Sequence, residues 1–173
     1  DAVAITATAV FATRRDTWSA TDAGAPEVPA ASALPRAPAV PPAPWTRNYD
    51  MRFVRGGLPD RENPHADLDS VTWVWIRDDP PRPLDFAALA SICDAFFPRI
   101  FVRRPRWVPA STVSITTYFH ADAALLAAQG TEPVLCTARA SHFGRGYHDQ
   151  AAEIWGRDGA LLATSHQIVY YKE

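Results

Sequence analysis

The chain has 173 residues, enough for one domain plus additional material. Its residues are 47% hydrophobic and 21% charged, which is the composition of a soluble globular protein. A formal net charge of −2 excludes the global basic field that binds nucleic acid or an anionic membrane. No apolar run approaches the roughly 18 residues that a membrane span requires.

The first predicted element lies within residues 1–20. Between Val3 and Phe11, apolar residues alternate with small and polar ones at a period of two, which predicts a strand. One or two strands are not stable alone. We therefore expect them to close a sheet whose other strands lie elsewhere, and a chain that begins at Asp1 rather than Met also suggests that a preceding portion is absent.

Residues 21–46 are rich in proline separated by small residues, which predicts an extended, polyproline-like connector. The alternative is a disordered linker. Val28, Leu34, Val40 and Trp45 give the segment apolar side chains, which favours a connector that lies along a surface.

Residues 47–173 have the pattern of a complete α+β domain. Asp158-Gly159 predicts a hairpin turn, and 121–129 a helical turn or a loop. A helix is expected over 85–97, where Pro98 stops it. One helix against a mostly antiparallel sheet is the expected architecture. The predicted strands are 49–54, 70–77, 111–120, 133–142, 147–156 and 160–171.

Asp94 is the unusual residue of the predicted helix because it lies in an otherwise apolar stretch. A carboxylate among apolar residues requires a partner, a shifted pKa or a chemical role. Helical geometry places it on the flank of the apolar stripe, at the edge of the core. The alternative is a solvated carboxylate or a salt bridge to Arg99, Arg103 or Arg104 downstream.

Three segments together resemble the second half of the acyl-CoA thioesterase II family: Cys93–Pro98, Thr112–His120 and Asp158–Gln167. Members of that family are double hotdog proteins, in which a long connector joins two hotdog repeats. The resemblance implies a hotdog fold for 47–173, a connector at 21–46, and in 1–20 the closing strands of an incomplete first repeat.

The resemblance also implies a function and a site. The family's catalytic set is an Asp on the helix, a Thr on the following strand and a Gln on the last strand, which fall on Asp94, Thr112 and Gln167. We expect hydrolysis of acyl-CoA to free acid and thiol. Asp94 would be the general base, its pKa raised by burial, and Thr112 and Gln167 would orient the attacking water.

Substrate contacts are expected elsewhere. Arg103 and Arg104 belong to a cluster of arginines that can meet the phosphates of coenzyme A, unless the cluster is a solvated loop or pairs with Asp94. Phe97 and Trp107 are candidates for lining the acyl tunnel, with ordinary core packing as the alternative.

Two other functions are alternatives to thioester hydrolysis. An enoyl thioester hydratase is disfavoured because its helix usually has a His partner, and no His lies near Asp94. A non-catalytic acyl-thioester binding or assembly subunit remains an alternative.

Associations and location complete the expectations. An exposed edge strand favours a homo-oligomer or association with the missing first repeat. Cys93 and Cys136 are expected to be buried thiols, which favours a cytoplasmic location. The spacing of the histidines does not suggest a metal site. Neither a metal nor a cofactor is expected.

Overall fold

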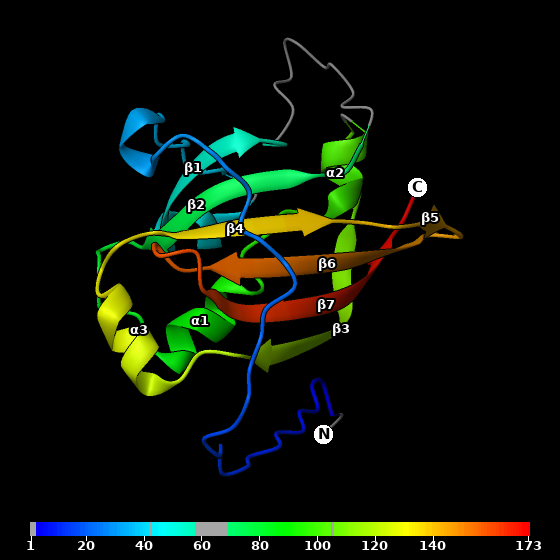
Figure 1. The fold of residues 1–173 in the computed structure, drawn as a ribbon. Coiled ribbons are helices and arrows are strands. Elements are labelled where there is room, and N and C mark those ends of the chain that lie inside the picture. Colours follow the sequence, from blue (N-terminus) through cyan, green and yellow to red (C-terminus); the bar gives the residue numbers. More distant parts are fainter. Residues whose placement is uncertain (1–2, 42, 58–68, 105) are drawn as a thin grey trace.

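A single antiparallel sheet dominates the computed structural model, which describes residues 3–41, 43–57, 69–104 and 106–173 (Figure 1). The strand order is β1-β2-β4-β6-β7-β3, with the short β5 paired to β6. The strands are β1 (Tyr49–Arg55), β2 (Thr72–Asp78), β3 (Ala110–Phe119), β4 (Val134–Arg139), β5 (Phe143–Gly144), β6 (Tyr147–Trp155) and β7 (Leu161–Tyr171). The helices are η1 (Ala31–Ala33), η2 (Pro44–Asn48), α1 (Phe86–Ile92), α2 (Arg99–Arg103) and α3 (Ala123–Gln129).

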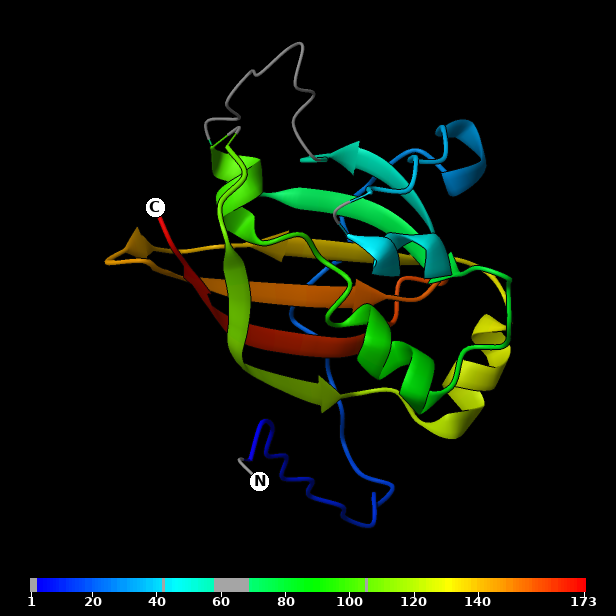
Figure 2. The same cartoon turned by 180° about the vertical axis from the view of Figure 1, so that it is seen from behind.

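The two faces of the sheet have different coverings. Helix α1 packs on one face, which Figure 2 shows from the helix side, and its Leu89 and Ile92 belong to the same buried core as Val74 and Ile154 of the strands. The connector crosses the other face, where the indole of Trp75 donates to the Pro29 carbonyl oxygen at 3.0 Å. The predicted strands of the domain and the α+β class are thus confirmed.

The predicted helix over 85–97 is too long. Helix α1 begins after Asp85, whose side chain accepts a hydrogen bond from the Ala88 N–H at 2.7 Å, and it ends at Ile92. Asp94 N and Ala95 N then donate to carbonyls three residues back, at 3.1 and 3.0 Å. These tighter bonds end the helix. The next helix, α2, begins after Pro98, which is its N-cap. Asp94 therefore lies in a turn, not within a helix.

The strand predicted within residues 1–20 does not form in the described residues 3–20. A strand needs a neighbour for its backbone groups, whereas Arg14 of this segment meets the sheet edge through its side chain, which donates to the carbonyls of Phe119 and His120. Val3, Ile5 and Phe11, the apolar residues of the alternation, are exposed.

The connector of residues 21–46 lies along the domain, as its apolar residues predict. Ala37 N donates to the Met51 carbonyl at 2.8 Å, and the ring of Trp45 lies 5.3 Å from that of Phe97. Trp45 and Ala37 pack against the main core. The connector therefore contributes side chains to the helix side of the domain as well as crossing the opposite face.

Both cysteines, Cys93 and Cys136, are buried and free. Among the described residues, no helix has the length and apolarity needed to cross a membrane. In the same part of the chain, no group of three His, Cys, Asp or Glu residues is arranged to hold a metal ion.

Candidate functional site

A cleft of about 600 Å³ opens between the end of α1, the edge strand β3 and the residues that lead into β1. Polar and apolar side chains line it in similar measure, and the one carboxylate among them is that of Asp94. Apolar walls with convergent polar groups are typical of a small-molecule site. The lining residues are Trp45, Asn48, Tyr49, Ala90, Ser91, Asp94, Ala95, Ile115 and Thr117.

The carboxylate of Asp94 faces this cleft and has a partner on the last strand. Gln167 Nε2 donates a hydrogen bond to Asp94 Oδ1. Asp94 is reached by solvent through the cleft, but the surrounding protein removes part of its hydration. This burial raises the pKa of Asp94 above its ordinary value, and the hydrogen bond from Gln167 opposes the rise. The net direction is upward, which suits a general base.

Two threonines of β3 differ in their relation to Asp94. Thr117 lines the cleft together with Asp94, whereas Thr112 is exposed and is not among the lining residues. A bulge after Thr112 shifts the strand by one residue, so that Ile115 pairs with Gln167 and Thr117 with Ser165. The structure thus brings Asp94 and Gln167 together and adds Thr117 rather than Thr112.

Thr117 also contacts the turn that contains Asp94. Burial raises the pKa of the Cys93 thiol to about 12, a hydrogen bond with Thr117 opposes this rise, and the charge of Asp94 adds to it. Ser165, across from Thr117, donates to the Cys93 carbonyl at 3.2 Å. These bonds tie the Asp94 turn to both β3 and β7.

The arginine cluster divides into groups with different surroundings. Arg99 is fully buried, so it is neither a surface anion site nor a direct partner of Asp94, whose partner is Gln167. Arg103 and Arg104 are exposed at the end of α2, where Arg104 forms an ion pair with Glu173. Neither of these two lines the Asp94 cleft.

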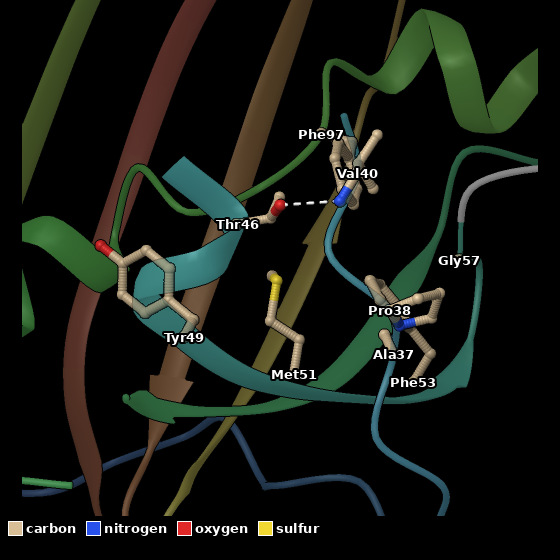
Figure 3. A pocket seen from close by; sticks show the side chains of 9 residues that line it. All are labelled: Ala37, Pro38, Val40, Thr46, Tyr49, Met51, Phe53, Gly57 and Phe97. Carbon is tan, nitrogen blue, oxygen red and sulfur yellow. Dashed lines mark hydrogen bonds between the residues drawn. The ribbon is translucent and has the colours of Figure 1, made fainter. Parts of the chain in front are cut away.

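The two aromatic candidates lie in different places. Trp107 packs on Phe101, with ring centroids 4.6 Å apart, away from the Asp94 cleft. Phe97 instead lines a second, apolar hollow of about 240 Å³ between the connector and β1. Figure 3 shows Val40 from the connector opposite Met51 and Tyr49 from β1.

Tyr49 links the two hollows because it lines both of them. Its hydroxyl group is hydrogen-bonded to the hydroxyl of Ser91 on α1. Burial raises the pKa of Tyr49, the bond to Ser91 opposes the rise, and neighbouring carboxylates, Asp94 among them, add to it. Tyr49 is therefore a neutral wall between the polar cleft and the apolar hollow.

Together, the antiparallel sheet, the packed helix and the cleft at the helix end define a hotdog-fold protein. The chain belongs to the acyl-CoA thioesterase C-terminal domain family, whose model matches residues 13–171. No match was found among curated proteins.

Solved structures agree with this assignment. A conserved protein of unknown function with a hotdog fold from Alicyclobacillus acidocaldarius is 48% identical, with a TM-score of 0.85, over 92% of this chain and 59% of that one. An acyl-CoA thioesterase II from Mycobacterium marinum is 20% identical, with a TM-score of 0.65, over 92% and 59% of the two chains. A putative thioesterase II from Thermobifida fusca is 19% identical, with a TM-score of 0.71, over 91% and 57%.

The chain thus spans less than two thirds of the length of these relatives. The fold corresponds to the C-terminal portion of double hotdog thioesterases, so the predicted hotdog fold and family resemblance are confirmed.

Proposed function

We propose that the protein hydrolyses acyl-CoA thioesters, with Asp94 as general base. The observation that carries this proposal is the contact between Asp94 and Gln167 at a cleft that Thr117 also lines. A carboxylate with a raised pKa, held by an amide donor and open to a cleft, can accept a proton from water.

In the proposed reaction, Gln167 occupies Asp94 Oδ1 and leaves Oδ2 for a water molecule. As the water oxygen attacks the thioester carbonyl, its proton passes to Oδ2, and the C–S bond then breaks. The protonated Asp94 returns the proton to the thiolate, so that free acid and thiol are the products. The Thr117 hydroxyl orients the water or the thioester oxygen.

We assign the substrate's apolar and charged ends to different parts of the domain. Trp45, Ala95 and Ile115 receive the first carbons of the acyl chain. The hollow lined by Phe97, which shares the wall of Tyr49, takes the distal carbons. Arg103 and Arg104, as exposed cations, remain proposed contacts for the phosphates of coenzyme A. Trp107, which packs on Phe101, remains a proposed substrate contact.

Release of free thiol from a series of acyl-CoA thioesters of increasing chain length tests the proposal, with the full chain as the enzyme. Turnover of at least one member supports it. Saturable binding of acyl-CoA without thiol release would favour the non-catalytic binding or assembly subunit instead. If the chain neither bound nor hydrolysed any acyl-CoA, both functions would be excluded.

A further inference from the structure

A line of three hydrogen bonds connects a buried arginine to Asp94. Arg99 Nε donates to Gln150 Oε1 at 3.0 Å, Gln150 Nε2 donates to Gln167 Oε1 at 3.2 Å, and Gln167 Nε2 donates to Asp94 Oδ1. The first three residues are 0%, 1% and 4% exposed. Bulk water therefore does not compete for the bonds from Arg99 to Gln150 and from Gln150 to Gln167.

We propose that Arg99 and Gln150 are positioning residues, which act through Gln167 to keep an N–H donor, and not a carbonyl, directed at Asp94. The inference rests on the proposed function in one respect, namely that Asp94 acts as a base.

The chemistry of the side chains fixes the direction of this relay. A guanidinium group only donates hydrogen bonds, whereas a glutamine amide has a donor end and an acceptor end. Gln150 must turn its oxygen to Arg99, so its NH₂ group faces Gln167. Gln167 must then offer its oxygen to Gln150, and its NH₂ group is left for Asp94. Reversing either glutamine would oppose two donors or two acceptors.

Arg99 is suited to anchor this line because its surroundings hold it in place. It also donates to the Phe97 carbonyl at 3.1 Å, to the Ser70 carbonyl at 3.2 Å and to Thr72 Oγ1. Within the described ranges of the chain, no carboxylate pairs with it. Burial lowers the pKa of Arg99 to about 9, which leaves the group protonated at neutral pH.

The orientation of Gln167 shifts the pKa of Asp94. An N–H donor stabilises the ionised carboxylate, whereas a carbonyl favours the protonated form, which cannot accept a proton from water. The titratable groups beside Asp94 are Tyr49 of β1 and Cys93 of the same turn. Both have raised pKa values and stay neutral at neutral pH. After desolvation by burial, the hydrogen bond with Gln167 is the next influence on the pKa of Asp94, and the orientation of the amide sets the sign of that influence.

The substitution Gln150→Glu tests the relay because it keeps the shape of the side chain and reverses its polarity. One carboxylate oxygen accepts from Arg99, and the other now accepts from Gln167, which must rotate and turn its carbonyl to Asp94. We expect the pKa of Asp94, followed by ¹³C NMR of its carboxyl carbon, to rise. We also expect kcat at neutral pH to fall about 10²-fold, as for other small misplacements of catalytic groups, with little change in KM.

A matched control is Gln129→Glu. Gln129 is a glutamine of α3 with 4% exposure, and it bonds the Glu132 and Pro133 carbonyls at 3.0 and 3.1 Å. This change adds the same charge to another buried glutamine. Gln129→Glu should leave the pKa of Asp94 unchanged.

The new charge of Gln150→Glu also acts on Asp94 through space, and a second background separates the two effects. In Gln167→Leu the relay is already broken, so adding Gln150→Glu should shift the pKa of Asp94 only by the through-space effect, which is smaller than the shift in the unmodified background. An equal shift in both backgrounds would overturn the relay, as would an unchanged titration in Gln150→Glu alone.

Gln150→Met provides a second variant, should Gln150→Glu not fold. It removes both bonds without adding a charge, and we expect it to raise the pKa of Asp94 and to lower kcat; no change in either would count against the relay. The titration needs no substrate. A relay that behaves as expected in a protein without turnover would therefore contradict the proposed function and leave the relay standing.

Discussion

Gln167 donates a hydrogen bond to Asp94 across 73 positions of the sequence, and this bond joins β7, the last strand of the chain, to the turn after α1. Gln167 lies between Gln150 of β6 and Ile115 of β3 in the sheet register. The site is therefore assembled only when both neighbouring strands have paired. The position of Asp94 depends on the complete sheet and not on the helix alone.

The first prediction concerns pH. Because burial raises the pKa of Asp94, kcat/KM for an acyl-CoA should increase as the pH rises through a value above 3.8, the ordinary pKa of an aspartate. The sign follows from the ionised form being the base. Cys93, with a pKa of about 12, adds no limb at neutral pH. Initial rates between about pH 4 and 9 give the profile, and a limb that persists unchanged in Asp94→Asn would assign it to another group.

The second prediction compares two threonines of the same strand. Thr117→Val should lower kcat/KM by about 10- to 100-fold because it removes the hydroxyl beside Asp94 and preserves the shape of the side chain. Thr112→Val makes the same chemical change at a position outside the cleft. Steady-state kcat/KM values of the two variants show which threonine orients the water or the thioester oxygen. A larger loss for Thr112→Val would return the role to Thr112.

The third prediction concerns the distal part of the acyl site. Val40→Phe places a larger side chain in the hollow beside Phe97, so KM for long acyl-CoA substrates should rise while kinetics with the shortest ones change little. Val28→Phe enlarges a partly buried valine elsewhere on the connector and serves as the control. Equal effects on short and long substrates would argue against the hollow as the chain's location.

The fourth prediction concerns stability and Asp50. Burial raises the pKa of this carboxyl, but hydrogen bonds from Arg52 and Arg77 outweigh burial and lower it overall. Asp50 therefore contributes stability that is present above its unfolded-state pKa and is lost as the pH falls through its lower folded-state pKa. Asp50→Asn should reduce the free energy of unfolding by about 1–3 kcal/mol at neutral pH, and by less at pH 3.

Urea unfolding at the two pH values measures this difference. Asp79→Asn is the control because the pair of Asp79 with Arg36 is more exposed, and such pairs contribute about 0–1 kcal/mol. An Asp50 effect that does not depend on pH would show that the two arginine bonds are not its source.

Much of the fold could be predicted because strand signals in this chain are local. The aromatic and β-branched residues of 70–77 and the Asp158-Gly159 turn predict β2 and the β6–β7 hairpin within a few residues of their observed bounds. The helix was predicted too long because its apolar stripe continues to Phe97, while the chain leaves the helix at Ile92. The 1–20 alternation has a strand's pattern but no paired neighbour in the described chain.

The site was predictable only in part. Asp94 stands out because it is a carboxylate in an apolar stretch, and Arg99 carries the same signal, since Phe97-Pro98 and Ile100-Phe101 flank it. The nearby Arg103 and Arg104 nevertheless favour a solvated position for Arg99, and of these three arginines only those two are exposed. Thr117 could not be selected over Thr112 because a bulge changes which face each residue occupies, and period-two counting does not detect a bulge.

The most direct test of the account is kcat/KM for a hydrolysed acyl-CoA with the unmodified chain and with Asp94→Asn. Asparagine keeps the size of the side chain and can still bond to Gln167, but it cannot accept the proton of water. We expect kcat/KM to fall by about 10²–10⁴-fold in Asp94→Asn, with an unchanged unfolding transition. Turnover that survives the substitution at its original rate would contradict the assignment of Asp94 as the base.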